Sequence, residues 1–541
     1  MKAPRACRQC RESKRKCLRP NQSLGDPCEP CRKRKLHCAG LLARSPSSPQ
    51  SLLPKPSAEL TGKDENGAAV TVTQAPSSDI STDVAILLVD YYLDKLHYRP
   101  HTLFHPPTLR KQVRDGLVNK ALLLAICSMG SRFAEDEDIR SLEIPWMDES
   151  KQLLLADLES KGVENIQTGI LIANLCAAHL NPSSEALFFR ISISLLQVME
   201  LGAPKGGTNL IDLEIKRRLR WTLFMADRWS SSSLGLPRQL SDTELAVDLP
   251  MDELVFESLT PEMTRLDVPW QPGLWAHKIS LVQLFGPIQD LNRRSAYGSI
   301  TSGEVEKSVA SLDQQLENWE WMLPIDVRMG DENFERHVKR GTGGPFVALH
   351  LGYHHYATLL YFRFLEPLVP SSPTAALYRN KCKFHASSYS NLVKLARQRE
   401  NCEVIYPTVG HMAVVSSSVL LHTLLFGEEA DIQGARDAMN SNFAAIVELR
   451  QFWLNTAPMI NRLIAFQNFC LLSTDHRTHQ LDGWMIRFLI EYALPLEEKD
   501  IQPVKSAMMS DIDSFSSRTQ ALTKQGRYTS FTTQDSFDWG V

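Results

Sequence analysis

The sequence lacks the features of secreted and membrane-spanning proteins. Arg5, Arg8 and Arg11 interrupt the amino-terminal stretch, which therefore has no apolar run like that of a signal peptide. The longest apolar stretch, residues 412–426, is shorter than a membrane span and contains three serines and one histidine. We therefore expect a soluble protein with no membrane partner.

Motifs that mark common enzyme classes are missing as well. The sequence contains no H-E-x-x-H, no G-x-S-x-G and no glycine-rich loop that could hold phosphate. His97, His101 and His105 have helical spacing, but prolines between and after them break the helix that would align three imidazoles. His354 and His355 lie in an aromatic-rich segment and are expected to pack there. We predict that the protein is not an enzyme.

Alternating apolar patterns typical of strands are scarce between residues 84 and 500. Apolar residues instead recur three and four positions apart, which predicts helices. No repeat of fixed period indicates a regular solenoid, and no sustained heptad predicts a dimeric coiled coil. With 541 residues, of which 43% are hydrophobic, the chain can bury a large core, and we expect an all-α bundle or helical array.

The helical pattern is strong enough to place individual helices. An amphipathic helix begins near Ile211 and keeps Ile215, Leu219 and Leu223 on one face. The segments 166–180 and 185–201 are expected to form an antiparallel pair, broken at an Asn-Pro dipeptide. Other helices are expected at 117–133, 275–292, 304–322, 347–365, 382–397, 408–426 and 437–454.

Cysteine, by contrast, is concentrated near the start of the chain. The segments C-R-Q-C-R-E-S-K-R-K-C and C-E-P-C-R-K-R-K-L-H-C repeat one C-x2-C-x6-C unit, ten residues apart. A two-residue gap brings two thiolates onto one ion, and the six-residue gap returns a third. A disulfide framework would need an oxidising compartment, and a redox C-x-x-C would not explain the third cysteine. The predicted metal ligands are Cys7, Cys10, Cys17, Cys28, Cys31 and Cys38.

The number of ligands indicates the kind of metal site. A closed zinc site needs four donors, and each half of the motif supplies three. If one cysteine of each half bridges both ions, six thiolates serve two tetrahedral zincs, so we expect two zinc ions. The remaining cysteines are scattered and are expected to be reduced, buried thiols: Cys127, Cys176, Cys382, Cys402 and Cys470.

Positive charge is concentrated in the same segment. Residues 1–40 contain 12 Lys and Arg against three acidic residues, a net charge of +9. Because the whole chain has a net charge of −3, the remaining residues carry a net charge of −12. Beside a zinc module, such a basic patch favours duplex DNA as the partner. The basic runs at 14–16 and 32–35 are also typical of nuclear import signals, and both interpretations can hold.

The cysteine spacing resembles the fungal zinc binuclear cluster family of transcription factors. The resemblance implies that Cys7 and Cys28 are the bridging ligands. The family pattern C-R-x-x-K-x-K-C is matched by Arg11, Lys14 and Lys16. It implies that Lys14 reads base edges, typically at a CGG triplet, while Arg11 and Lys16 contact phosphates. The expected DNA contacts are Arg11, Lys14, Arg15 and Lys16.

A second stretch resembles the middle homology region of the same regulators. Its pattern is a basic pair, an aromatic-rich helix with Asp-Arg, a Gly-x-Pro turn and a later Leu-Pro. The simpler interpretation is structural: Arg217 and Arg218 lie on the helix surface or form salt bridges with Asp227 or Glu214, and bind nothing. The matching residues are Arg217, Arg218, Trp221, Asp227, Arg228, Gly235, Pro237, Leu249 and Pro250.

Four regions follow from these observations. We expect a zinc binuclear cluster DNA-binding domain at 1–40, a flexible linker at 41–83, an all-helical regulatory domain at 84–500 and a disordered tail at 501–541. The linker is rich in proline and serine and has no aromatic residue between 39 and 83. The tail ends in a mixture of acidic and aromatic residues typical of an activation segment, although it can equally be a plain tail.

The predicted function is a nuclear, sequence-specific DNA-binding regulator of RNA polymerase II genes. The alternative is a zinc-cluster protein that docks onto other proteins, or acts as a corepressor, without direct DNA readout. The sequence leaves two further partners open, a second copy of the chain and a coactivator that binds the tail.

Overall fold

The computed structural model describes residues 80–160, 162–201, 209–241, 248–266, 268–365, 373–454, 456–472 and 483–493, with 517, 519–528, 530–531 and 537–538. The chain divides into two compact units, Met1–Ala75 and Pro76–Val541, and the described residues belong to the second. The predicted zinc cluster, the DNA contacts and the linker up to residue 79 lie outside the described residues.

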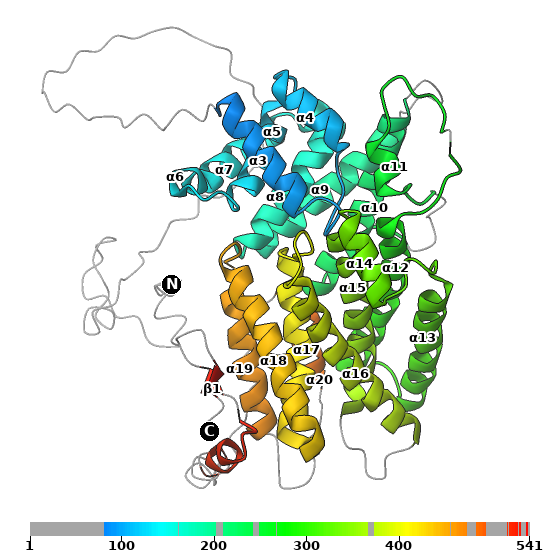
Figure 1. Cartoon of the computed structure of the whole chain (residues 1–541), viewed down its shortest axis with the longest axis vertical. Coiled ribbons are helices and arrows are strands. Elements are labelled where there is room, and N and C mark those ends of the chain that lie inside the picture. The colour runs from blue at the N-terminus through cyan, green and yellow to red at the C-terminus, as the bar shows by residue number, and fades with distance from the viewer. Residues whose placement is uncertain are drawn as a thin grey trace, which may run out of the picture. The chain divides into compact units, whose positions relative to one another are not determined.

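The described part of the second unit is all-α, as predicted. The first group of helices occupies the upper part of Figure 1. Gly130 lets two of them, α3 and α5, approach closely, because a Cβ at this position would lie 2.1 Å from the carbonyl oxygen of Leu88. The group comprises α3 (Thr82–Lys95), α4 (Pro106–Arg114), α5 (Lys120–Ser131), α6 (Glu137–Ser141), α7 (Glu143–Ala156), the 3-10 turn η1 (Leu158–Ser160), α8 (Val163–Ala178) and α9 (Pro182–Leu201).

The next helix, α10 (Leu210–Ser233), connects this group to the rest of the domain. The Asn209 side chain caps its first turn by accepting a hydrogen bond from the Asp212 backbone N–H at 2.8 Å. The helix ends at a tight turn in which Gly235 has a φ of +66°, a conformation that favours glycine.

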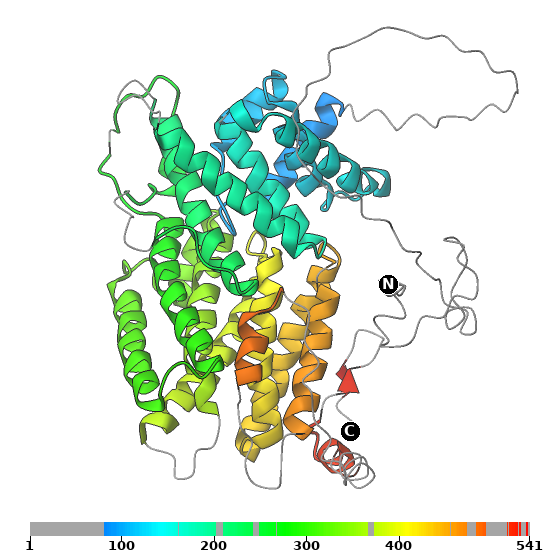
Figure 2. The ribbon, with the colours of Figure 1, turned by 180° about the vertical axis from the view of Figure 1, so that it is seen from behind.

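Apart from its short first member α11, which lies in the upper part of Figure 1, the second group of helices fills the lower part of Figures 1 and 2, where α15 to α19 run side by side. It comprises α11 (Glu253–Glu257), α12 (Leu274–Ala296), α13 (Ser302–Met322), α14 (Asp331–Lys339), α15 (Gly343–Tyr361), the 3-10 turn η2 (Phe362–Leu365), α16 (Pro373–Ala396), α17 (Pro407–Phe426), α18 (Glu429–Arg450), α19 (Thr456–Leu472) and α20 (Gly483–Ile490).

Helix α17 is the centre of this second group. It includes the apolar stretch 412–426 but is 20 residues long, so by length and composition it could cross a membrane, the only such helix among the described residues. The helix thus begins at Pro407, before the apolar stretch identified in the sequence. Nearly every α17 residue is buried against neighbouring helices, as in the core helix of a globular domain.

Most predicted helices are confirmed, with shifted ends. The antiparallel pair is α8 and α9, and the Asn181 side chain caps α9 by accepting a hydrogen bond from the Ser184 backbone N–H at 3.1 Å. The helix predicted from residue 117 begins at Lys120, because Asn119 caps it, and Leu117 is left 69% exposed. Helices α16 and α18 begin nine and eight residues before the predicted starts at 382 and 437, in polar turns where the apolar pattern is weak.

Part of the carboxyl-terminal segment is ordered, contrary to the predicted disordered tail. Residues 519–524 are helical, and Leu522 and Tyr528 pack against the core. The Arg527 guanidinium donates to the Gly427 carbonyl oxygen at 2.9 Å and pairs with Glu429 at 3.0 Å, at the junction of α17 and α18. Beyond it, β1 (Ser530–Phe531) and β2 (Phe537–Asp538) form an antiparallel pair.

Candidate functional site

A buried ionic network surrounds the first half of α10. The Glu214 carboxylate is fully buried and accepts hydrogen bonds from Arg218 Nε at 2.9 Å, from the Met251 backbone N–H at 3.0 Å and from Arg217. The Arg218 guanidinium, also fully buried, donates to the Met251 carbonyl oxygen at 2.7 Å and lies 4.3 Å from the centre of the Phe256 ring. The two charged side chains therefore bind both the backbone N–H and the carbonyl oxygen of Met251, which fixes the position of this chain segment.

This segment, residues 248–253, leads into α11 and is hydrogen-bonded to both α10 and α12. The Trp221 indole donates to the Asp248 carbonyl oxygen at 3.0 Å. The Glu253 carboxylate accepts hydrogen bonds from the backbone N–H groups of Leu274 and Trp275, at 3.1 and 2.8 Å, and thereby caps α12. Burial raises the pKa of Glu253, while the nearby Arg218 charge lowers it.

A third buried carboxylate organises the turn after α10. Asp227 accepts hydrogen bonds from the backbone N–H groups of Gln239 and Leu240, both at 3.0 Å, and pairs with Arg228 at 3.2 Å. The residues that resemble the middle homology pattern thus stabilise the turn after α10 and the segment 248–253 that packs against this helix. The predicted pairing of Arg217 and Arg218 with Glu214 is confirmed, but Arg218 is buried, not on the helix surface.

The histidines singled out in the sequence have structural roles. His97, His101 and His105 lie on the segment between α3 and α4 and at its end, and all three are buried. His101 Nε2 is 2.9 Å from the Tyr92 hydroxyl, and burial lowers the pKa of His101 to about 3, so its ring is neutral. His354 and His355 pack among aromatic rings, as predicted. No group of three metal-ligating side chains occurs in the part of the chain that the structure describes.

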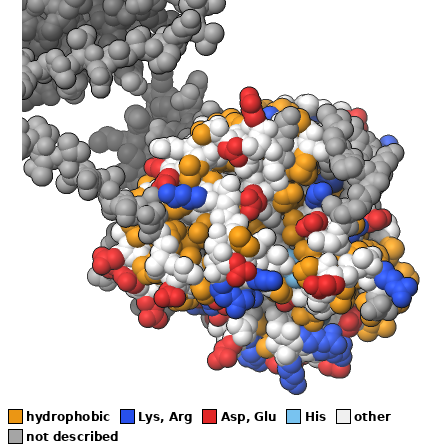
Figure 3. All heavy atoms as spheres, turned by 90° about the horizontal axis from the view of Figure 1, so that it is seen from above, with side chains coloured by type: hydrophobic (Ala, Val, Ile, Leu, Met, Phe, Trp, Pro, Cys, Tyr) orange, Lys and Arg blue, Asp and Glu red, His pale blue; other side chains and the backbone are white. Residues whose placement is uncertain are grey.

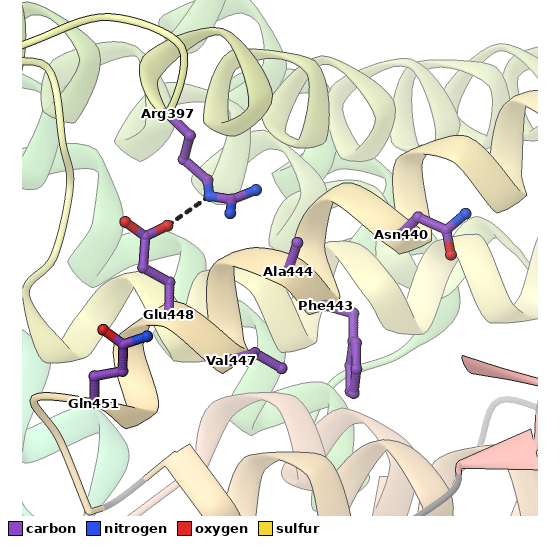
Figure 4. Close-up of a pocket in the computed structure, with 7 residues that line it drawn as sticks. All are labelled: Arg397, Asn440, Phe443, Ala444, Val447, Glu448 and Gln451. Carbon is purple, nitrogen blue, oxygen red and sulfur yellow. Dashed lines mark hydrogen bonds and ion pairs between the residues drawn. The ribbon is translucent and has the colours of Figure 1, made fainter. Parts of the chain in front are cut away.

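The surface offers weak candidates for a binding site. On the face shown in Figure 3, described acidic and basic side chains are interspersed with apolar ones, so neither sign forms a continuous field. Figure 4 shows an open groove of about 580 Å³ along α18. Its charged side chains, Arg397 and Glu448, point toward one another and form an ion pair at 2.6 Å. A ligand in this groove would have to compete with that pair.

A second hollow, of about 490 Å³, lies between α13, α15 and α16. Its polar groups also bind one another: the Tyr353 hydroxyl donates to Glu320 at 2.7 Å, and Lys381 pairs with Glu317 at 2.7 Å. His354 Nδ1 and His385 Nδ1 lie 3.0 Å apart, and burial lowers the pKa of His385 to about 4. These contacts stabilise the hollow without a ligand.

The strongest candidate is a partly open cavity between the two groups of helices. It has a volume of about 450 Å³, within the range typical of small-molecule sites. Its walls come from α8, α9 and α10 on one side and from α17, α19 and residues 492–493 on the other. Much of the lining is apolar and includes Ile170, Phe189, Ala226, Val414 and Met459.

A strip of polar side chains also lines this cavity. Glu185 of α9 forms a side-chain hydrogen bond with Ser230 of α10 and lies close to Tyr492. The Tyr492 ring stacks on His411 of α17 with centroids 3.7 Å apart, and Arg462 of α19 lies nearby. These residues come from five separate parts of the chain, so no sequence motif could have predicted the cavity.

The site residues predicted from the sequence lie outside the part of the chain that the structure describes. The zinc ligands Cys7, Cys10, Cys17, Cys28, Cys31 and Cys38 and the DNA contacts Arg11, Lys14, Arg15 and Lys16 all lie outside the described residues. The remaining five cysteines are free and buried, as predicted.

Known proteins resemble this chain over much of its length. Residues 89–320 match the fungal specific transcription factor domain. The chain is 21% identical over 420 residues to the Zn(2)-C6 fungal-type transcription factor FTF1c of Fusarium oxysporum f. sp. lycopersici. The matched region covers 70% of this chain and 44% of that protein. It is 23% identical over 432 residues to an uncharacterized transcriptional regulatory protein, C530.11c, of Schizosaccharomyces pombe, covering 69% and 51%. The chain thus spans about half the length of these curated relatives. No solved structure matches it.

Proposed function

We propose that the chain is a fungal Zn(2)-C6 transcription factor and acts as a sequence-specific DNA-binding regulator of RNA polymerase II genes, a proposal that its similarity to such factors supports. The observation that carries this proposal is the doubled C-x2-C-x6-C pattern within a segment of net charge +9. Six thiolates can hold two zinc ions, and the surrounding Lys and Arg supply the electrostatic attraction on which DNA affinity depends. The regulator acts in the nucleus, and the basic runs at 14–16 and 32–35 support its import.

Zinc binding is the first test. Forty residues bury too little apolar surface for a core, so the folding free energy of the module comes from metal binding, on the order of 10 kcal/mol for structural zinc. Native mass spectrometry of the full chain should find two zinc ions. Cys7→Ser or Cys28→Ser should lose both, because each removes a bridging ligand, while Cys176→Ala in the helical domain should keep both. A single zinc ion in the unmodified chain would contradict the proposal.

DNA readout is the second test, and it separates two kinds of contact. A side chain that reads a base edge discriminates among sequences, whereas one that neutralises a phosphate strengthens binding to every duplex. Lys14→Ala should cost about 1–3 kcal/mol on a CGG-bearing duplex and little on a scrambled one. Arg11→Ala and Lys16→Ala should weaken both duplexes alike, each reducing the salt slope by about one.

The same titration tests the alternative function. A zinc-cluster protein that docks onto other proteins, or acts as a corepressor, without reading DNA would bind CGG-bearing and scrambled duplexes equally at every salt concentration. Equal weakening of both duplexes by Lys14→Ala would remove the base-reading role proposed for that residue.

Two protein partners complete the proposal. A homodimer would read paired half-sites, which the protein-to-DNA stoichiometry of the complex measures. Residues 506–541 would bind a coactivator through aromatic side chains that neighbouring aspartates keep in solvent. Tethered to an unrelated DNA-binding domain, this segment should activate a reporter, and Phe537→Ala with Trp539→Ala should abolish that activation. A reporter no stronger than the tether alone would contradict the coactivator role.

A further inference from the structure

The cavity between the two groups of helices has the properties of a ligand site. Its volume of about 450 Å³ can hold a small organic molecule, and its walls belong to segments from residue 100 to residue 493. One molecule bound there would contact both groups of helices at once. The proposed DNA-binding function makes no use of this cavity.

Glu185 is the informative side chain of the cavity wall. Among the described residues, no Lys or Arg forms an ion pair with its carboxylate, and its polar partner is Ser230. Burial raises the pKa of Glu185 to about 7, which reflects the cost of a carboxylate charge without a counter-charge. A half-buried carboxylate in this state gains most from a ligand that supplies a cation.

The surroundings of Glu185 also suit a cation with an apolar body. Aromatic rings of Phe189, Trp229 and Tyr492 line the same cavity, and ring faces attract cations. The neighbouring His411 does not compete for the carboxylate, because burial holds its pKa well below the usual value and leaves its ring neutral. The one cation of the strip, Arg462, already donates to the Phe488 carbonyl oxygen and lies over the Phe488 ring.

We propose that this cavity binds an apolar small molecule carrying a basic nitrogen, with the ammonium group paired to Glu185 and the apolar body against the aromatic and aliphatic walls. The competing chemistry is a carboxylate, held near Arg462 and the amino-terminal turns of α17 and α19. These turns carry partial positive charge and also line the cavity.

Three probes that differ only in their head group test the proposal: 4-phenylbutylamine, 4-phenylbutan-1-ol and 4-phenylbutanoic acid. Calorimetric titration of the full chain at pH 8 should give an amine affinity at least about tenfold above that of the alcohol, because a charged hydrogen bond replaces a neutral one. The acid should bind most weakly. Glu185→Gln should reduce the amine affinity to that of the alcohol and leave the alcohol affinity unchanged.

Two further variants make the result specific to the cavity. Glu159→Gln removes an exposed carboxylate on the turn after α7 and should leave all three affinities unchanged. Ala226→Trp should abolish binding of all three probes, with an unchanged circular dichroism spectrum as the check on folding. The proposal is overturned if the acid binds more tightly than the amine, if Glu185→Gln leaves amine binding unchanged, or if none of the probes binds.

Discussion

The two halves of α10 face different surroundings. In the first half, the carboxylate of Glu214 and the guanidinium of Arg218 are fully buried, and each is hydrogen-bonded to residues of a returning segment. In the second half, Thr222, Ala226 and Ser230 lie four residues apart and line a cavity of about 450 Å³. The first half thus places a buried ion pair against the returning segment, whereas one face of the second half borders unfilled space.

This difference shows how stability and binding can share one helix. Unfilled space next to a half-buried carboxylate costs stability, because wall atoms lose packing contacts and the charge loses part of its solvent. The paired charges of the first half fix where the helix lies, so the cavity keeps its shape. We therefore expect substitutions in the first half to lower stability and filling substitutions in the second half to raise it.

The largest effect should come from Arg218→Ala. Removing this side chain leaves the Glu214 carboxylate buried with fewer partners, and breaking a buried ion pair costs about 3–5 kcal/mol. Urea unfolding followed by circular dichroism measures the loss. Arg217→Ala is the matched control: its side chain is 23% exposed, so water can replace part of its pairing with Glu214, and it should cost less than Arg218→Ala. Equal losses for the two variants would contradict the proposed division of α10.

The next effect is a pH dependence set by Glu185. Its pKa is about 7 in the folded domain, against an ordinary value of 4.5, so ionisation favours unfolding. The stabilisation of the folded domain by the neutral Glu185 carboxyl is fully present below pH 4.5 and is lost as pH rises to about 7. This loss lowers the unfolding free energy by an amount on the order of 2–3 kcal/mol. Tyr492, His411 and His101 stay neutral over this range, and Arg462, with a pKa of about 10, stays charged.

Glu185→Gln checks this pH dependence directly. The variant should be more stable than the unmodified chain at pH 8 and nearly equal to it at pH 4.5, as measured by urea midpoints at each pH. A stability difference that stays constant between these pH values would show that the Glu185 carboxyl titrates as if exposed to solvent.

A smaller loss is expected from Asp227→Ala. Without the carboxylate, the backbone N–H groups of Gln239 and Leu240 lose their acceptor, at a cost of about 1–3 kcal/mol. Asp227→Asn keeps one oxygen acceptor and should lose less. Thermal unfolding compares the two variants, and a loss as large for Asn as for Ala would contradict the role assigned to these hydrogen bonds.

The same comparison explains what could be predicted from the sequence. The antiparallel pair α8–α9, the Asn-Pro break and the Glu214 pairing all depend on residues close together in the chain, and all were predicted. The cavity was not, because Glu185 and Tyr492 meet across about 300 residues of sequence. Nor did periodicity reveal the ordered segment 519–528, because its contacts are with residues far away in the sequence, such as the hydrogen bond from Arg527 to the Gly427 carbonyl oxygen.

The most direct test of an unfilled site beside the second half of α10 is the unfolding free energy of Ala226→Leu in the full chain. Ala226 lines the cavity, and the added carbon atoms have room within about 450 Å³. If the second half of α10 maintains an unfilled site, the variant should gain about 0.5–2 kcal/mol, the usual result of filling a cavity. A loss of about 1–3 kcal/mol, as expected for overpacking, would show that this part of α10 is already close-packed and would contradict the account.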